Sequence, residues 1–307
     1  MHRQETNCES EPKSSELSIA IVGDVHNQWS ESDAAALKTL DVDLVLFVGD
    51  FGNEAIDIVQ QVANVSLPKA VILGNHDAWY TAGTKHRKHC PYDLNKEDRV
   101  QQQLDALGDA DVGFSKLELP QHQVTVVGGR PFSWGGSTWR HHSFYQERYG
   151  VANFEESAAK ISELVAIAQH DTLIFLGHNG PAGLGEQTYD ICGRDWKRKG
   201  GDYGDPDFAS AIATAQDSNH KVPLVVFGHM HHELRYDKTR LRKRLVVDDH
   251  GTIYLNGAQV PRVIATDDGY RRSFTLVTLQ SGAVKSVCLI WLNTEHAIVS
   301  EEYLYQT

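Results

Sequence analysis

Four short patterns of polar residues recur along the chain, and each follows directly on an apolar run. They are GDVH with Asp24 and His26, VGD with Asp50, GNHD with Asn75, His76 and Asp77, and GHMH with His229 and His231. A fifth apolar run, TLIFLG, ends at His178. A mixture of imidazole, carboxylate and amide donors without thiolates suits Mn²⁺, Fe²⁺, Fe³⁺ or Zn²⁺. The five segments therefore predict a site for divalent metal ions.

The spacing inside the patterns predicts which side chains share an ion. Residues i and i+2 of an extended segment point to the same side, so Asp24 and His26 can bind one cation, as can the two imidazoles of GHMH. The carboxylate of Asp50 has two oxygens and can bridge two cations. Asn75 offers a neutral carbonyl oxygen.

The apolar runs must position these residues. Runs of four to eight apolar residues that end in glycine are typical of buried strands, predicted here at 18–23, 43–49 and 69–74 and before His178 and His229. Helices predicted near 31–40 and 54–65 complete βαβ units of a largely parallel sheet. In open α/β sheets the ligand crevice lies beyond the carboxyl ends of the strands. All five segments are therefore expected at one rim.

The rest of the chain is predicted to complete a single domain. Residues 1–17 are polar and predicted to be a disordered tail, and residues 18–307 form the domain. We expect a cap insertion at 80–110 and a flexible, glycine-rich loop at 180–206. Short apolar runs after His232 predict an antiparallel second sheet stacked on the first.

In order and spacing, the five segments resemble the calcineurin-like metallophosphoesterase superfamily, whose signature is DxH, GDxxD, GNH[DE], H and GHxH. The resemblance covers about residues 18–257. It implies a four-layer α/β/β/α sandwich of two mixed sheets flanked by helices. It also implies that a metal-bridging hydroxide attacks a small phosphate mono- or diester in line. One metal would be held by Asp24, His26, Asp50 and His231, and the second by Asp50, Asn75, His178 and His229.

His76 resembles the family's histidine that contacts the phosphate and protonates the leaving oxygen. Such a histidine needs a partner that orients its other ring nitrogen. The sequence departs from the family pattern here, because Asn53 stands where GDxxD has its second aspartate. Asn53, Glu54 and Asp77 remain alternatives for the orienting role, and we predict Asp77 to be catalytic together with His76 and Asp50. GDFGNEA in place of GDxVDRG argues against the Ser/Thr protein phosphatase branch.

Two residues of the glycine-rich segment VVGGRPFSWGGSTWRHH are predicted to bind substrate, namely Arg130 and His141. An arginine can hold a phosphate through two parallel hydrogen bonds. The alternative is that the aromatic residues of this segment bury surface while its charges face water.

The composition of the chain limits the kinds of molecule that it is expected to bind. The chain has 29 basic and 41 acidic residues, a net charge of −12, which argues against a nucleic-acid polymer and leaves a small phosphorylated substrate. No apolar run approaches the roughly 18 residues of a membrane span, and the acidic leader is untypical of transit peptides, so we expect no membrane partner and a cytoplasmic location. The oligomeric state stays open. The alternative function is a metal-binding regulator or interaction module on the same fold, which binds metal without hydrolysing an ester.

Overall fold

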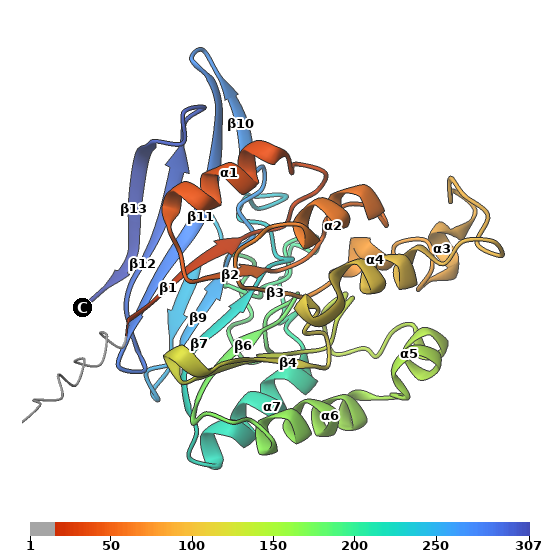
Figure 1. Cartoon of the computed structure of the whole chain (residues 1–307). Coiled ribbons are helices and arrows are strands. Elements are labelled where there is room, and N and C mark those ends of the chain that lie inside the picture. Colours follow the sequence, from red (N-terminus) through yellow and green to blue (C-terminus); the bar gives the residue numbers. More distant parts are fainter. Residues whose placement is uncertain (1–15) are drawn as a thin grey trace, which may run out of the picture.

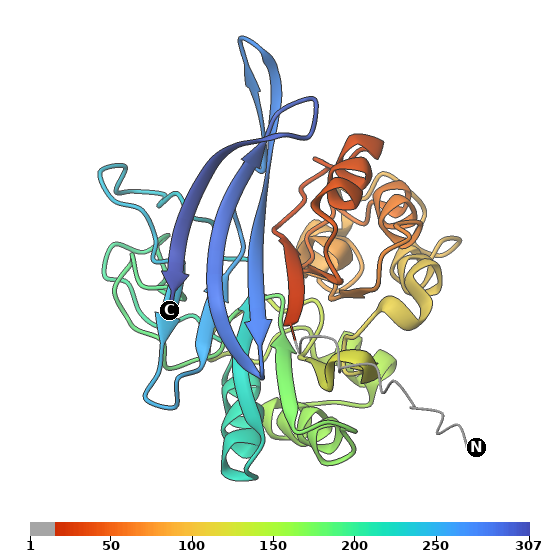
Figure 2. The ribbon, with the colours of Figure 1, turned by 60° about the vertical axis from the view of Figure 1, so that its left-hand side comes forward.

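The computed structural model describes residues 16–307, which form two mixed β-sheets packed face to face with helices on their outer sides (Figures 1 and 2). The predicted α/β/β/α fold class is confirmed. Both sheets combine parallel strands with antiparallel strands at their edges.

The first sheet has the strand order β13-β12-β11-β1-β2-β3, with β10 paired to β11. Strands β1, β2 and β3 run parallel, and β11 pairs antiparallel with β1. The strands are β1 (Glu16–Val22), β2 (Leu44–Phe47), β3 (Lys69–Val71), β10 (Val263–Thr266), β11 (Gly269–Gln280), β12 (Ala283–Leu292) and β13 (Ile298–Gln306).

The second sheet has the order β4-β5-β6-β7-β9-β8. Its four central strands β5, β6, β7 and β9 are parallel, and β4 and β8 are antiparallel edges. The strands are β4 (Lys116–Leu119), β5 (Val124–Gly128), β6 (Thr172–Leu176), β7 (Lys221–Phe227), β8 (Leu245–Val247) and β9 (Ile253–Asn256).

Seven α-helices and three short 3₁₀ helices are present among the described residues. α1 begins at a capping box in which Ser30 and Asp33 satisfy each other's backbone N–H groups. The α-helices are α1 (Glu31–Leu40), α2 (Ile56–Ala63), α3 (Thr84–Arg87), α4 (Arg99–Leu107), α5 (His142–Tyr149), α6 (Phe154–Ala166) and α7 (Pro206–Asp217). The 3₁₀ helices are η1 (Asn75–Ala78), η2 (Gly108–Ala110) and η3 (Pro120–His122).

The continuously apolar strands place apolar side chains on both faces of their sheets. In β1, Ile19 and Ile21 belong to the core between the sheets, whereas Ala20 and Val22 belong to the core under the helices. This alternation is the period of two of a strand. Because both faces are covered, the strands are fixed in register, and so are the loops at their carboxyl ends.

Two features differ from the prediction, the placement of the late strands and the start of β1. The late strands do not form a sheet of their own: β10 to β13 extend the first sheet through β11, and β8 and β9 extend the second. β1 already begins at Glu16, so the predicted tail overlaps the strand by two residues, and residues 1–15 lie outside the described part. The prediction of one antiparallel second sheet was therefore wrong, because both sheets are mixed.

The predicted cap at 80–110 divides into two parts. α4 packs on α2 within the helical layer, and the side chain of Gln103 donates to the Asp77 carbonyl oxygen at 2.8 Å. α3 and its flanking loops project away from the sheets, at the right of Figure 1. Within the segment 180–206, isolated bridges join Pro181 to Asp205 and Gly193 to Asp202.

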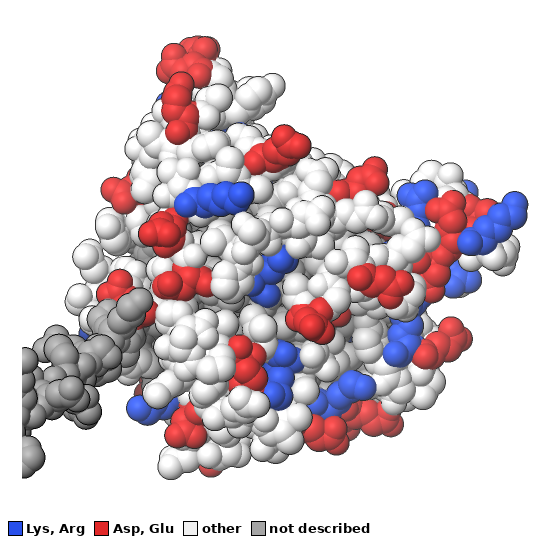
Figure 3. Space-filling view, in the orientation of Figure 1, with Lys and Arg blue, Asp and Glu red and all other residues white. Residues whose placement is uncertain are grey.

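The surface in Figure 3 carries acidic and basic side chains interspersed with each other, with no continuous basic area on this face. Within residues 16–307, no helix combines the length and the hydropathy needed to cross a bilayer.

Candidate metal centre

Seven predicted ligand side chains meet where strands of both sheets end. Each lies within four residues of a strand end: Asp24 and His26 after β1, Asp50 after β2, Asn75 after β3, His178 after β6, and His229 and His231 after β7. They come together because these strands run in the same direction within each sheet.

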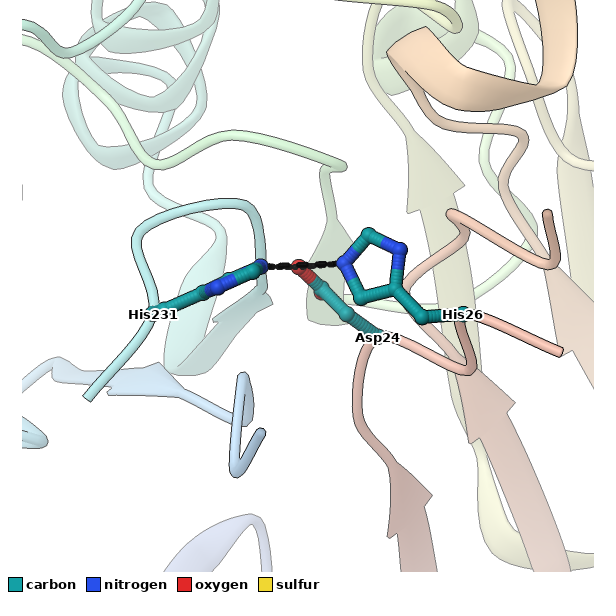
Figure 4. Close-up of side chains that lie close together, drawn as sticks. All are labelled: Asp24, His26 and His231. Carbon is teal, nitrogen blue, oxygen red and sulfur yellow. Dashed lines mark hydrogen bonds and ion pairs between the residues drawn. The ribbon is translucent and has the colours of Figure 1, made fainter. Parts of the chain in front are cut away.

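The first group consists of Asp24, His26 and His231, each of which offers an atom within 4.8 Å of the others (Figure 4). The Nε2 atoms of the two histidines are 3.0 Å apart. The Asp24 carboxylate lies 3.4 Å from Nε2 of His231 and 3.9 Å from Nε2 of His26. The three side chains thus surround one small volume.

The second group consists of Asp50, His178 and His229. Nε2 of His178 lies 3.3 Å from Oδ1 of Asp50 and 3.0 Å from Oδ1 of Asn75. The other oxygen of Asp50 lies 3.8 Å from Nε2 of His26 in the first group. Asp50 therefore stands between the two groups, as a bridging ligand would.

The second group is built to hold a cation. Nδ1 of His178 lies 2.7 Å from the Val48 carbonyl oxygen, which only accepts, so the ring proton sits on Nδ1. The lone pair of Nε2 then faces two further acceptors, the oxygens of Asp50 and Asn75. Acceptors that face each other in a buried site are unfavourable unless a positive charge lies between them. The residues present therefore fit a divalent metal ion.

The pKa shifts of His229, Asp24 and Asp50 agree with metal binding. Burial, followed by the nearby His178, lowers the pKa of His229 to about 3, so its imidazole is neutral, as a metal ligand must be. Burial alone raises the pKa of Asp24, but His231, His178 and His26 together lower it below its usual range. The same opposition between burial and neighbouring histidines lowers the pKa of Asp50. Neutral imidazoles and ionised carboxylates are the forms that bind metals.

Three ligand residues have strained backbones. The φ angles of His26, Asp50 and His229 are +43°, +53° and +66°, in the left-handed region that residues other than glycine rarely adopt. Such conformations cost on the order of 1 kcal/mol or more each and persist where the surroundings enforce them. The His26 amide donates to the Asp50 carbonyl at 2.7 Å, which ties two of these turns together.

Two glycines allow the ligand loops to approach each other. A Cβ on Gly74 would lie 2.3 Å from Oδ1 of Asp50, and a Cβ on Gly228 would lie 2.2 Å from Oδ1 of Asp24. Neither position has room for a side chain without displacing a ligand carboxylate.

Asn53 is the residue that orients His76. Its Oδ1 accepts a hydrogen bond from Nδ1 of His76 at 2.6 Å, which leaves Nε2 free to face the site. Of the three alternatives that the sequence left open, the structure selects this one. His76 groups with His26 and Asp50, and its ring contacts that of His26 at 4.9 Å. Burial lowers its pKa, while the charge of Asp50 acts in the opposite direction.

The placement of Asp77 corrects a prediction. Its side chain is fully buried, and its carboxylate accepts from the backbone amides of Asp50 at 2.9 Å, Phe51 at 2.9 Å and Gly74 at 2.7 Å. Burial and the charge of Asp50 raise its pKa, and the three N–H donors oppose this rise. Both oxygens are occupied by the loops that carry the ligands. Asp77 is thus a brace under the site and not a catalytic residue.

Arg130 also lies elsewhere than predicted. Its buried guanidinium donates to Asp207 at 2.7 Å and to Asp205 at 2.9 Å, and these two charges hold its pKa above the usual range although burial acts to lower it. A guanidinium occupied in this way cannot clamp a substrate phosphate. His141 is half-buried in the same region, with its ring 5.7 Å from that of Trp134, and its substrate role stays a prediction.

An aromatic stack behind His76 was missed from the sequence. Trp79 stacks on His76 with ring centroids 4.3 Å apart and 12° between the planes. His86 of α3 and Trp134 stack on Trp79 at 4.1 Å and 5.1 Å. The stack thus joins neighbouring residues of η1 and α3 to Trp134, more than 45 residues later in the chain. GNHDAW alone gives one signal: a 3₁₀ turn brings residues i and i+3 to the same side.

These features define a class of protein, the metal-dependent hydrolases that act on phosphoesters. The chain belongs to the calcineurin-like phosphoesterase family, whose model matches residues 17–233.

Solved structures with a related fold have low sequence identity to the chain. TT1561 of Thermus thermophilus is 10% identical, with 94% of this chain and 99% of that chain covered and a TM-score of 0.48. The purple acid phosphatase PPD1 from seeds of yellow lupin (Lupinus luteus) is 14% identical, with 96% and 54% covered and a TM-score of 0.45. An archaeal phosphodiesterase is 12% identical, with 94% and 99% covered and a TM-score of 0.35. No curated protein shows a significant match to the chain.

Proposed function

We propose that the chain is a dinuclear metal-dependent phosphoesterase that hydrolyses a small phosphate mono- or diester. The observation that carries the proposal is the convergence of acceptor atoms in two groups that share Asp50. One cation would be held by Asp24, His26, Asp50 and His231, and the other by Asp50, Asn75, His178 and His229. Two such cations lower the pKa of bound water and stabilise negative charge on the phosphoryl oxygens. The imidazole, carboxylate and amide donors suit Mn²⁺, Fe or Zn²⁺.

His76 supplies the proton transfer in this proposal. Its Nδ1 stays bonded to Oδ1 of Asn53, and the ring is held flat against Trp79. Nε2 is thereby aimed at the region between the ligand groups, where it delivers a proton to the leaving oxygen. An oriented side chain of this kind contributes roughly 10²- to 10⁴-fold to the rate. Asp50 acts at the same time as the shared ligand.

The test is hydrolysis of p-nitrophenyl phosphate and bis-p-nitrophenyl phosphate by protein loaded with Mn²⁺, alongside elemental analysis. Asp50→Asn is expected to lose both a metal ion and activity. His76→Ala is expected to keep its metal content and to lose kcat, by at least roughly a hundredfold for an ester with an alkyl leaving group and by less for the two p-nitrophenyl esters, whose leaving group needs little protonation. The exposed Asp57 and His89 provide matched controls, as Asp57→Asn and His89→Ala.

The outcomes separate the enzyme from a metal-binding regulator. Turnover that is lost in both site variants and kept in both controls supports the enzyme. Two bound metal ions per chain without hydrolysis of either ester, or of a panel of nucleotide esters, refute the proposal and favour the regulator. The preferred ester distinguishes a monoesterase from a diesterase.

A further inference from the structure

A cavity of about 420 Å³ opens beside the candidate metal centre. One wall is formed by the ligands His229 and His231. The cavity is also lined by Trp196, which belongs to the segment 180–206, and by Arg235, which belongs to the loop after the GHMH segment. We call this cavity the flank pocket. Its volume is in the range of small-molecule binding sites in proteins.

Most charges in the flank pocket are already paired. The buried guanidinium of Arg242 donates to the carbonyl oxygens of His231 at 3.0 Å and Asp190 at 2.9 Å, and it lies 3.3 Å from the Asp195 carboxylate. These contacts are structural, because they tie the loop that carries Trp196 to the GHMH segment. Lys238 lies 3.6 Å from Glu233 in an exposed ion pair.

Arg235 is the cation of the flank pocket that lacks a partner. Its side chain is exposed, and its guanidinium makes no hydrogen bond or ion pair with any residue of the described range 16–307. Its backbone amide donates to the Asp195 carboxylate at 2.9 Å, which fixes the residue at the rim. A positive charge held in this place without a counter-ion favours an anionic group in the pocket.

Trp196 provides a planar aromatic side chain in the lining of the flank pocket. Its ring meets Tyr203 with centroids 4.4 Å apart and the planes at 88°, an edge-to-face contact. Within residues 16–307 no ring is stacked in parallel on Trp196, in contrast to Trp79, and the indole lines the cavity, where a planar group can stack on it. A neighbouring cavity of about 350 Å³ shares Asp195 and adds Arg198 and Tyr236, whose side chain is 60% exposed. Aromatic and cationic side chains thus line both the flank pocket and the cavity next to it.

The position of His76 indicates which part of a substrate enters this pocket. The ring of His26 contacts His76 at 4.9 Å and His231 at 5.0 Å, and so lies between the two. If His76 protonates the leaving oxygen, the leaving group lies on its side of His26. In an in-line attack the entering and leaving oxygens lie opposite each other, and the group that stays bonded to phosphorus projects sideways from the line between them. The flank pocket beside His231 is a cavity that can receive this group without competing with the leaving group on the His76 side.

We propose that the flank pocket binds the retained group of a phosphodiester substrate, and that this group contains a planar aromatic ring and a second negative charge. The inference rests on the proposed function. Water adds its oxygen to phosphorus, the bond from phosphorus to the leaving oxygen breaks, and the leaving group departs as an alcohol. The product is a monoester that keeps the ring. Trp196 stacks on the ring, and Arg235 pairs with the second anion.

The test uses three diesters with the same p-nitrophenolate leaving group. They are methyl p-nitrophenyl phosphate, the p-nitrophenyl ester of thymidine 5′-phosphate, and the same thymidine ester with a further phosphate on the 3′-oxygen. Stacking of a base on an aromatic side chain supports a preference of roughly five- to a hundredfold in kcat/KM for thymidine over methyl. The 3′-phosphate is expected to increase kcat/KM further, with a steep decrease as salt is raised.

Two variants assign these preferences to residues. Trp196→Ala is expected to reduce the thymidine-to-methyl ratio to about one, and Arg235→Gln to abolish the gain from the 3′-phosphate. The exposed residues Tyr270 and Lys285, on the strands β11 and β12, provide controls as Tyr270→Ala and Lys285→Ala, which leave both ratios unchanged.

The failure of this inference differs from failure of the proposed function. Hydrolysis of the methyl ester without a preference for thymidine, or a preference that survives Trp196→Ala, overturns the flank pocket inference alone. A 3′-phosphate gain that survives Arg235→Gln overturns the role of Arg235. Hydrolysis of p-nitrophenyl phosphate with none of the three diesters also overturns the flank pocket inference alone. Absence of hydrolysis of p-nitrophenyl phosphate and of all three diesters by metal-loaded protein overturns the proposed function itself.

Discussion

Replacing Asp77 by asparagine tests whether this residue braces the ligand loops. Its Oδ2 accepts from the amides of Asp50 and Gly74, and its Oδ1 accepts from the amide of Phe51. An asparagine keeps one acceptor oxygen. With that oxygen at the Oδ2 position, the NH₂ group faces the Phe51 amide, donor against donor. At least one hydrogen bond is lost, and one buried N–H is left unsatisfied.

The magnitude follows from these contacts. A hydrogen bond to a charged acceptor contributes about 1.5–3 kcal/mol, and an unsatisfied buried donor costs about 1–3 kcal/mol. Since the lost bond and the orphaned donor describe the same Phe51 amide, the two are not summed. The weakening of the two remaining bonds is added to that single loss. We therefore expect Asp77→Asn to lower the free energy of unfolding by about 2–4 kcal/mol.

The assay is urea unfolding of the metal-free protein, followed by metal binding at a concentration where the variant is folded. Asp57→Asn makes the same chemical change at an exposed position of α2 and is expected to stay within about 0.5 kcal/mol of the parent. The brace is refuted if Asp77→Asn matches this control in stability and metal content yet loses turnover. That result would restore Asp77 to the catalytic residues.

Four further predictions follow from other features. Arg130→Met leaves two buried carboxylates without their cation, and urea unfolding is expected to show a loss of about 3–5 kcal/mol; a loss below about 1 kcal/mol would contradict the buried pairing. Burial raises the pKa of Asp111 to about 7, above its unfolded value of 3.8, so the native state holds an extra proton between these values. Its contribution to stability therefore falls as pH rises through this window, by up to about 1.4 kcal/mol per pH unit, and Asp111→Asn should remove that slope in unfolding curves measured from about pH 4.5 to 8. Trp79→Leu removes the ring stacked on His76 and is expected to lower kcat roughly two- to tenfold for an ester with an alkyl leaving group and less for a p-nitrophenyl ester; equal effects on both would argue against action through His76. Chelation by EDTA should abolish hydrolysis and lower the thermal midpoint of unfolding, since a cation at about 100 times its Kd stabilises the folded state by about 2.7 kcal/mol, and Mn²⁺ should restore both; an unchanged midpoint would count against a metal site.

The ligand positions could be predicted because they depend on local patterns. An apolar run predicts a buried strand. The polar residues that follow the run then lie at the carboxyl end of that strand. Asp24, Asp50 and His229 were found in this way. The strained φ angles that turn these residues toward each other were not, since they arise from contacts between loops of different strands.

The errors concern partners that are distant in sequence. Arg130 was predicted to bind an anion of the substrate. The prediction failed because its partners Asp205 and Asp207 lie more than 70 residues later in the chain. The sequence pattern predicts Asp77 to be catalytic because it does not show the buried amides of Asp50 and Phe51, which bind its carboxylate. The flank pocket joins Trp196 to Arg235 through a loop without strand or helix periodicity. The spacing of residues in the sequence does not predict contacts of this kind.

The pairing of β1 has a consequence for how the chain is made. Within this strand, Ile19 pairs with Leu44 of β2 on one edge and with Val277 of β11 on the other. The first edge can close early in synthesis, but the second must wait until nearly the whole chain has left the ribosome. During that interval, an apolar strand followed by two predicted metal ligands presents open N–H and C=O groups, which can pair with other chains. Its late closure makes the C-terminal strands a condition for a soluble product as well as for a complete sheet.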